Sequence, residues 1–289
     1  MTKRLLICDL DNTLYDWVKY FVDAFYALVD EVVAITGCNK EQLLDDFRNV
    51  HRKHHDAEHP FAVLETGTVQ KHFPGKSSAE IAKILDPGFH AFNSRRKRNL
   101  TLYPGVRETL DSLQMQNVTL VAHTESKFYA VVDRLSRLDL VRYFSHIYCR
   151  ERPSTLRPVG DRPSKYLSEF PSHRVIELSH HQRKPNPDIL VEICQREGIP
   201  SRNAAYVGDS MPRDVMMAKR AEVVAIWAKY GTQHADADYQ RLVRVSHWTP
   251  EDVAREKALA VEVSAIEPDY IAEKSFLEVL DALAIEWGR

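Results

Sequence analysis

The sequence lacks an excess of positive charge, and this limits the partners that it can bind. Its 289 residues contain 39 lysines and arginines against 41 aspartates and glutamates, for a formal net charge of −2. Because affinity for a polyphosphate backbone depends on a strong basic excess, this balance argues against a dedicated nucleic-acid binder. A content of 44% hydrophobic and 28% charged residues is that of an ordinary soluble globular protein.

Long apolar runs and clustered cysteines are also missing. No stretch approaches the roughly 18 apolar residues that a membrane span needs, so no membrane association is expected. The four cysteines lie far apart without a CxxC pair, which indicates neither a zinc site nor a disulfide framework. Only four apolar residues separate Arg4 from Asp9, too few for the apolar core of a signal peptide. We therefore expect a cytoplasmic protein, either a monomer or a homodimer.

Short apolar runs alternate with helical patterns through much of the chain. Each run has the length of a buried strand, and together they span residues 5–8, 118–122, 146–149, 175–178, 204–207 and 223–226. Apolar residues spaced three and four apart predict intervening helices, for example over 106–114, 127–137, 187–197 and 213–220. This alternation predicts an α/β protein with a parallel sheet covered by helices on both faces.

The segment from about Tyr15 to Leu102 interrupts the alternation with helical patterns and almost no strand signal. Apolar residues fall on one helical face in two stretches, at Val18, Phe21, Val22, Phe25 and Val29 and at Leu43, Leu44, Phe47 and Val50. Residues 103–105 (Tyr-Pro-Gly) are typical of a turn that returns the chain to the core. We expect a helical domain over 15–103, inserted into a core of 1–14 and 104–289. Irregular stretches at 150–172 and 231–250 predict excursions from that core, with a helix following near 251–263.

Acidic residues follow two of the predicted strands. Asp9 and Asp11 are two residues apart and project to the same side of an extended chain. They could share a cation, or act as nucleophile and proton-transferring acid, or simply be solvated acids at a strand end. Asp209 and Asp214 follow the strand at 204–207, where Gly208 permits a sharp turn. Asp214 could also be an ordinary acid at a helix N-terminus.

A hydroxyl and a cation are predicted at the same edge of the sheet. Thr124 follows the strand at 118–122, and Lys184 precedes a helix whose start is marked by Pro187. Open α/β sheets bind ligands at the carboxyl ends of their strands, which is where all these groups fall. The set therefore predicts a ligand site at that edge.

The ordered set resembles the haloacid dehalogenase superfamily. That family carries an Asp-x-Asp-x-Thr motif, a Ser or Thr after a strand, a Lys and a Gly-Asp-x-x-x-x-Asp motif. Residues 9–13, Thr124, Lys184 and residues 208–214 match these in order. The resemblance implies a Rossmann-like parallel sheet core with a mainly α-helical cap domain inserted after the first strand.

The resemblance also implies a role for each acid. Asp9 would attack phosphorus and form an aspartyl-phosphate, and Asp11 would protonate the leaving oxygen and later activate water. Mg²⁺ would be held by the Asp9 side chain, the Asp11 backbone carbonyl and Asp209, with Asp214 as a ligand or a partner of one. Haloalkanoate dehalogenation uses no second acid at the position of Asp11, so phosphoryl transfer is favoured.

Phosphate oxygens would be bound by Thr124, Lys184 and Asn12 on the same resemblance. Glu125 departs from the pattern, because the family commonly has a small polar residue after the hydroxyl. A carboxylate there fits only if it points away from phosphate or pairs with a cation.

The predicted activity is that of a Mg²⁺-dependent phosphatase acting on a small phosphorylated metabolite. A phosphomutase would instead return the phosphoryl group to its substrate. A phosphonate hydrolase would need a Schiff-base lysine in the inserted domain, where Lys53, Lys71 and Lys76 are available. A non-catalytic binding protein on the same fold is the remaining alternative.

Histidines are concentrated in one part of the inserted segment, at positions 51, 54, 55 and 59. The 51/55 and 55/59 pairs have the spacing with which a helix can present two ligands to a metal. Attraction of an anionic substrate is a second interpretation. Arg52 and Lys53 favour a third, a solvated and partly positive helix face.

Overall fold

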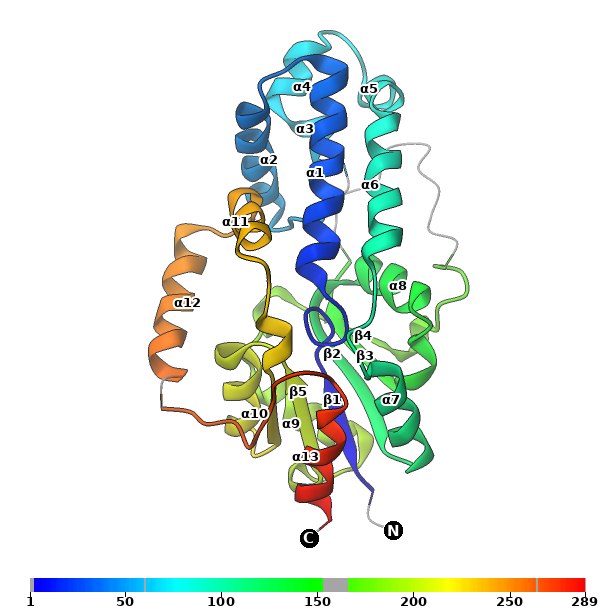
Figure 1. The fold of residues 1–289 in the computed structure, drawn as a ribbon, viewed down its shortest axis with the longest axis vertical. Coiled ribbons are helices and arrows are strands. Elements are labelled where there is room, and N and C mark those ends of the chain that lie inside the picture. Colours follow the sequence, from blue (N-terminus) through cyan, green and yellow to red (C-terminus); the bar gives the residue numbers. More distant parts are fainter. Residues whose placement is uncertain (1–2, 60, 153–165, 264, 289) are drawn as a thin grey trace.

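The computed structural model describes residues 3–59, 61–152, 166–263 and 265–288. A single parallel sheet lies in its lower half, with strand order β4-β3-β2-β1-β5-β6-β7 (Figure 1). The strands are β1 (Leu5–Cys8), β2 (Thr119–Lys127), β3 (His146–Arg150), β4 (Val175–Leu178), β5 (Ala204–Gly208), β6 (Val224–Ala228) and β7 (Tyr270–Ala272).

Strand β1 lies in the middle of the sheet, and both of its faces are apolar. Leu6 and Cys8 pack into one apolar cluster, whereas Leu5 and Ile7 pack into a second one, and all four are fully buried. A strand that is apolar on both faces is stable only between two layers of helices. The predicted α/β parallel sheet is therefore confirmed.

Helices cover both faces of the sheet. They are α7 (Val106–Met115), α8 (Phe128–Arg137), α9 (Pro187–Glu197), α10 (Met216–Arg220) and α13 (Glu278–Trp287), whereas α12 (Pro250–Val263) lies to the side of the sheet and contacts residues 211–215 (Figure 1). Shorter turns are η1 (Val141–Tyr143), η2 (Ser172–Arg174), η3 (His180–Gln182), η4 (Ser201–Asn203), the π-helical η5 (Met211–Val215) and η6 (Lys229–Thr232). The helix predicted over 213–220 is thus divided between η5 and α10.

Residues between β1 and α7 form a layer of helices beyond one end of the sheet (Figure 1). This helical insertion contains α1 (Trp17–Thr36), α2 (Lys40–His54), α3 (Ala62–Glu65), α4 (Gly67–His72), α5 (Ser78–Ile84) and α6 (Asp86–Asn99). The apolar positions predicted on α1 and α2 are all buried, as the 3.6-residue period requires. No helix among the described residues is both long and apolar enough to cross a membrane.

The two connections between sheet and insertion run side by side. Tyr15 forms a β-bridge with Leu102, and the Tyr103 amide donates to the Leu14 carbonyl over 2.9 Å. The expected turn follows, with Gly105 in the left-handed region at a φ of 81°. The insertion therefore leaves and rejoins the core at one point.

Helix α11 (Asp236–Val245) lies outside the insertion in sequence but packs against α1 and α2. Arg244 pairs with Glu41 and Asp45 on α2, and His51 Nδ1 lies 2.7 Å from the Val245 carbonyl oxygen. The excursion predicted at 231–250 therefore contains a helix, α11, which connects the sheet to the insertion. The excursion predicted at 150–172 falls mainly on residues 153–165, which lie outside the described residues.

The buried contact of His51 predicts an acid-sensitive stability. Burial lowers the pKa of His51 from its ordinary 6.5 to about 4, although the Val245 carbonyl opposes the shift. The neutral ring is thus favoured in the folded state, so its contribution is present above pH 6.5 and is lost as the pH falls towards 4. At full protonation the loss is about 3 kcal/mol.

Urea unfolding across this pH range tests the prediction. The free energy of unfolding of His51→Gln should fall less between neutral pH and about pH 4.5 than that of the wild type. His90→Gln, at an exposed position on α6, should show the wild-type slope. A His51→Gln slope equal to that of the wild type would contradict the assignment.

Candidate active site

Asp9 lies at the carboxyl end of β1 in a buried charge cluster. Its amide donates to the Val207 carbonyl of the neighbouring strand over 2.9 Å, which fixes the backbone there. Lys184 Nζ donates to Asp9 Oδ1 over 2.8 Å and to Asp214 Oδ1 over 2.9 Å. All three side chains are at most 10% exposed. The structure therefore brings together three of the predicted residues from segments far apart in the sequence.

Asp209 completes a group of acids beside this cluster. Ligand oxygens of Asp9, Asp209 and Asp214 lie within 4.8 Å of one another. Burial and then the charges of Asp214 and Asp9 raise the pKa of Asp209, and burial raises the pKa of Asp9 against the opposing charge of Lys184. Three carboxylates thus face a single ammonium group, and their oxygens are the donors that a hard divalent cation prefers. The arrangement fits a metal site.

Asp214 has fixed partners that an ordinary acid at a helix N-terminus would not need. Besides Lys184, it accepts from the Tyr206 hydroxyl over 3.2 Å and from the Ser210 amide over 3.0 Å. Although burial lowers the pKa of Lys184, the charges of Asp214 and Asp9 outweigh burial and raise it. Asp214 therefore holds the ammonium group of Lys184 in its charged form next to Asp9.

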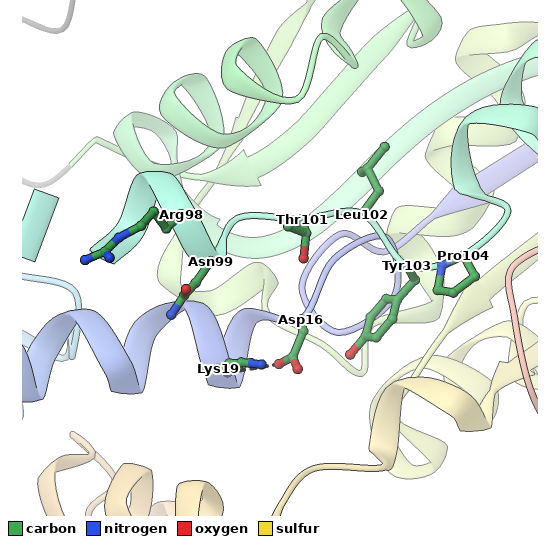
Figure 2. Close-up of a pocket in the computed structure, with 8 residues that line it drawn as sticks. All are labelled: Asp16, Lys19, Arg98, Asn99, Thr101, Leu102, Tyr103 and Pro104. Carbon is green, nitrogen blue, oxygen red and sulfur yellow. Dashed lines mark hydrogen bonds between the residues drawn. The ribbon is translucent and has the colours of Figure 1, made fainter. Parts of the chain in front are cut away.

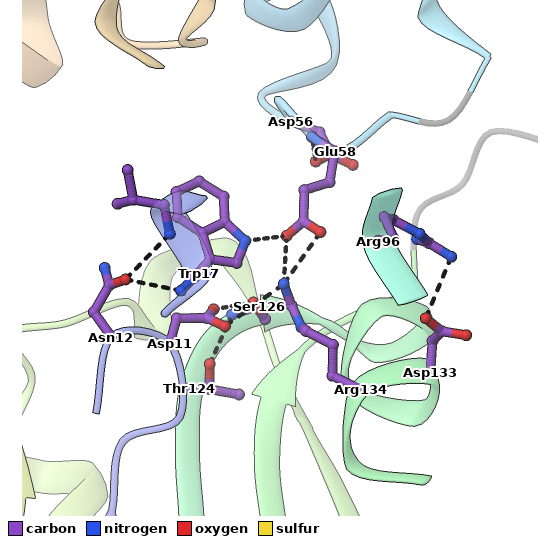
Figure 3. Close-up of polar contacts among 11 residues, drawn as sticks. Asp11, Asn12, Trp17, Asp56, Glu58, Arg96, Thr124, Ser126, Asp133 and Arg134 are labelled. Carbon is purple, nitrogen blue, oxygen red and sulfur yellow. Dashed lines mark hydrogen bonds and ion pairs between the residues drawn. The ribbon is translucent and has the colours of Figure 1, made fainter. Parts of the chain in front are cut away.

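The carboxylate of Asp11 points to a different set of partners. Ser126 Oγ donates to Asp11 Oδ2 over 2.5 Å, and Arg134 Nη1 lies 3.5 Å from Oδ1 (Figure 3). Two carboxylates spaced two residues apart are therefore divided between two tasks. Asp9 faces the ammonium group and the other acids, whereas Asp11 faces a hydroxyl and a guanidinium.

Thr124 is buried on β2, which continues past the predicted end at 122 to Lys127. The pairing of β2 with β3 becomes irregular after His123, and here the Ser126 amide donates to Thr124 Oγ1 over 3.1 Å. Glu125 points away from this hydroxyl and accepts from the Lys184 amide over 3.1 Å. Its carboxylate therefore positions the Lys184 backbone.

Asn12 has a local structural task. Its side-chain oxygen accepts from the amides of Trp17 and Val18 at the start of α1, over 3.1 and 3.3 Å (Figure 3). Asn12 also has a φ of 57°, a left-handed conformation that asparagine tolerates better than most residues. Its oxygen thus caps α1, which leaves the amide nitrogen as the side-chain group for a phosphate contact.

Segment η6 supports the same loop and was not predicted from the sequence. A Cβ on Gly231 would lie 1.7 Å from the Asn12 carbonyl oxygen, so only glycine fits there. The neighbouring Tyr230 hydroxyl donates to the Thr13 carbonyl over 2.6 Å. A Tyr-Gly pair two residues after a strand was the available signal.

A cavity of about 330 Å³ lies beside the connections to the helical insertion (Figure 2). Its lining residues are Asp16, Lys19, Arg98, Asn99, Thr101, Leu102, Tyr103 and Pro104. Asp16 caps α1 by accepting from the Lys19 amide, and burial together with Asp16 and Asp209 raises the pKa of Tyr103. None of Asp9, Thr124 or Lys184 lines this space, so it is separate from the charge cluster.

Two of the four histidines come together at a spacing other than i,i+4. His51 is buried against α11, whereas His54 and His59 stack and both contact Glu65. Glu65 also accepts from Lys53 over 2.7 Å, and ligand atoms of His54, His59 and Glu65 lie within 4.8 Å of one another, so this group could hold a metal ion. Lys53 is 68% exposed and paired, and Lys71 and Lys76 are exposed, so no observation favours a Schiff base on these lysines.

Comparison with known proteins points to one family. Residues 3–222 match the family model described as haloacid dehalogenase-like hydrolase, and residues 181–274 match a second model of HAD-like hydrolases. A crystal structure of 2-haloacid dehalogenase from Pseudomonas syringae pv. tomato DC3000 superposes with a TM-score of 0.57, covering 99% of both chains at 21% identity. At that identity the likeness establishes the fold.

Curated relatives include several phosphatases. A phosphoglycolate phosphatase of Pseudomonas fluorescens (strain Pf0-1) is 30% identical over 46% of this chain and 39% of its own length. One from Agrobacterium fabrum is 28% identical over 80% of this chain and 84% of its own. The glyceraldehyde 3-phosphate phosphatase of Methanopyrus kandleri is 23% identical over 79% of this chain and 84% of its own length. The match to the Pseudomonas fluorescens relative thus spans less than half of that protein.

Proposed function

Because the chain belongs to the haloacid dehalogenase-like hydrolase family, we propose that it is a Mg²⁺-dependent phosphatase of small phosphorylated metabolites. The observation that carries the proposal is the buried contact of Asp9 with Lys184, beside Asp209 and Asp214. A carboxylate nucleophile for phosphorus needs a cationic environment, since both reactants are anions. The second acid, Asp11, distinguishes this site from one for carbon–halogen cleavage.

The metal ion would be held by Asp9, Asp209 and the backbone carbonyl of Asp11, with Asp214 supporting the site through Lys184. When bound, Mg²⁺ supplies positive charge that offsets the repulsion between the nucleophile and the phosphate. The excess of carboxylates over ammonium groups in the cluster supports this assignment.

In the proposed reaction an oxygen of Asp9 bonds to phosphorus while the ester oxygen leaves. Asp11 donates its proton to that leaving oxygen, which departs as an alcohol. The resulting carboxylate of Asp11 then takes a proton from water, whose oxygen attacks the phosphoryl group. This second displacement releases inorganic phosphate and restores both acids, so that one hard step is replaced by two easier ones.

Thr124 and Lys184 would bind the phosphoryl oxygens during both displacements, with the amide nitrogen of Asn12 as a further donor. Both Thr124 and Lys184 are nearly fully buried, and the backbone of Lys184 is held by Glu125. Donors that are already oriented stabilise the charge of the transition state without reorganisation.

We further assign the helical insertion, residues 15–103, as a cap over the site. Glu58 of the insertion accepts from Arg134, a partner of Asp11, and Trp17 donates to Glu58, as Figure 3 shows. A cap in this place would exclude water and contact the leaving group. The names of the phosphatase relatives favour phosphate esters with a short carbon chain as substrates.

Phosphate release from a panel of esters tests the proposal. The panel contains p-nitrophenyl phosphate, phosphoglycolate and glyceraldehyde 3-phosphate, assayed with Mg²⁺ and with EDTA. We expect turnover of at least one ester, a fall of about 100-fold in EDTA, and recovery on adding excess Mg²⁺. Turnover that is unaffected by EDTA would contradict the metal assignment. Mg²⁺ binding without turnover of any ester would favour the non-catalytic alternative.

A further inference from the structure

Arg134 on α8 is a fully buried cation close to the candidate active site. Its guanidinium carbon lies 5.7 and 5.8 Å from the ring centroids of Tyr15 and Tyr20. A charge in such surroundings is costly unless it is paired and hydrogen-bonded. The partners that balance the charge of Arg134 therefore indicate its role.

Its strongest partner comes from the helical insertion. Arg134 Nη1 donates to both oxygens of Glu58, over 3.1 and 3.2 Å. Glu58 lies in the segment between α2 and α3, and it also accepts from Trp17 Nε1 over 3.1 Å (Figure 3). The insertion thus supplies the carboxylate that balances a cation of the core.

The same guanidinium also faces Asp11, since Arg134 Nη1 lies 3.5 Å from Asp11 Oδ1. Arg134 Nη2 donates to Ser126 Oγ over 2.5 Å, and Ser126 Oγ lies 2.5 Å from Asp11 Oδ2. A guanidinium can only donate, so the hydroxyl hydrogen of Ser126 must point to Asp11. Asp11 Oδ1 has no hydrogen-bond partner among the described residues. Oδ2 of Asp11 is therefore held by a hydrogen bond, whereas Oδ1 has only the ion pair with Arg134 Nη1 at 3.5 Å and keeps a lone pair for a proton.

We propose that Arg134 is a positioning residue for Asp11 and that Glu58 makes this position depend on docking of the helical insertion. The inference rests on the proposed function, in which Asp11 exchanges a proton with the leaving oxygen. Undocking would remove Glu58, leave the guanidinium without its main partner, and release Ser126 and Asp11 from a single orientation. The proton-transferring carboxyl would thus be in place only over an enclosed substrate.

A second ion pair between insertion and core provides a matched control. Arg96 on α6 lies 3.3 Å from Asp133, the residue that precedes Arg134 on α8 (Figure 3). Asp133 is 11% exposed and also pairs with Arg137, and among the described residues no contact links it to Asp11. Asp133→Asn therefore weakens docking of the insertion on the same helix and leaves the Ser126 bridge intact.

The experiment compares kcat/KM for two esters, because kcat/KM reports on the steps up to the first phosphoryl transfer. p-Nitrophenolate leaves without a proton, whereas an alkoxide needs one. The alkyl ester is phosphoglycolate, or the best alkyl phosphate of the panel above. For Glu58→Gln, Arg134→Lys and Ser126→Ala we expect kcat/KM to fall about 10- to 100-fold further for the alkyl ester than for p-nitrophenyl phosphate. Asp133→Asn should change both esters alike.

Equal losses for both esters, or an Asp133→Asn variant as selective as Glu58→Gln, would overturn the inference. Thermal unfolding of each variant checks the fold. If Arg134→Lys does not fold, Ser126→Ala still tests the inference, because it removes the hydroxyl between Arg134 and Asp11 without removing a charge. A wild-type protein that hydrolyses neither ester would instead refute the proposed function, so the two failures are distinguishable.

Discussion

Replacing Asp9 by Asn should lower turnover of every ester by about 10⁴-fold or more. An amide is a poor nucleophile for phosphorus, and no other carboxylate among the described residues takes its place at the end of β1. Lys184 keeps Asp214 as a partner in the variant, so the fold should persist. Phosphate release and thermal unfolding, measured on the same preparation, check both parts.

Asp188→Asn is the matched control for this change. Asp188 is an exposed acid in the first turn of α9 and takes part in no contact with the charge cluster. The same loss of one carboxylate should leave turnover unaltered there. Turnover retained by Asp9→Asn would rule out an aspartyl-phosphate on Asp9, whatever the effect of metal.

Mass spectrometry of the trapped intermediate extends the test. If the wild type is quenched in acid during turnover, a phosphoryl group should be found on the peptide that contains Asp9. Asp9→Asn should yield no such adduct. An adduct on another residue would move the nucleophile and contradict the role assigned to Asp9.

The position of the site could be predicted because it depends on strand ends. The apolar runs that became β1 and β5 were visible in the sequence, and parallel strands end at one edge. Asp9 and Asp209 therefore had to lie close together once both strands were recognised. The position of Lys184 could not be predicted from strand ends alone. Its approach to Asp9 depends on a loop whose backbone donates to Glu125.

The partners of Asp11 could not be predicted in the same way. Glu58 and Arg134 are 76 residues apart, and their contact depends on how the helical insertion packs on α8. A weak signal existed, because Arg134 lies one residue before the buried Leu135 and three after the buried Val131. A cation on the apolar face of a helix needs a buried partner, but the sequence does not identify it.

Two parts of the fold were missed for related reasons. Strand β7 has three residues at the sheet edge, too short for a periodic pattern. The contact of α11 with α2 uses the Val245 backbone carbonyl, a group that every residue has, and ion pairs of Arg244 with Glu41 and Asp45, whose side chains resemble any surface charges in the sequence. Patterns of side chains predict elements, whereas contacts between distant segments through backbone atoms leave no trace in composition.

Replacing Lys184 by Met should lower the free energy of unfolding by about 3–5 kcal/mol in the absence of divalent cations. The substitution removes the ammonium group that lies between Asp9 and Asp214 and leaves these carboxylates buried without a counter-charge. Mg²⁺ should recover part of this loss, because a bound cation supplies the missing charge and stabilises only the folded state. Urea unfolding with EDTA and with Mg²⁺ measures both quantities.

Lys127→Met provides the comparison that isolates burial. Lys127 pairs with Asp56 over 3.0 Å, but its side chain is 27% exposed, against 3% for Lys184. Water can solvate both members of that pair after substitution, so we expect a loss of about 1 kcal/mol or less and no recovery by Mg²⁺. Equal losses for the two variants would mean that burial does not set the energy of the Asp9 cluster. A Lys184→Met loss that Mg²⁺ leaves unchanged would argue that the three acids do not hold the ion, since the same carboxylates must serve both cations.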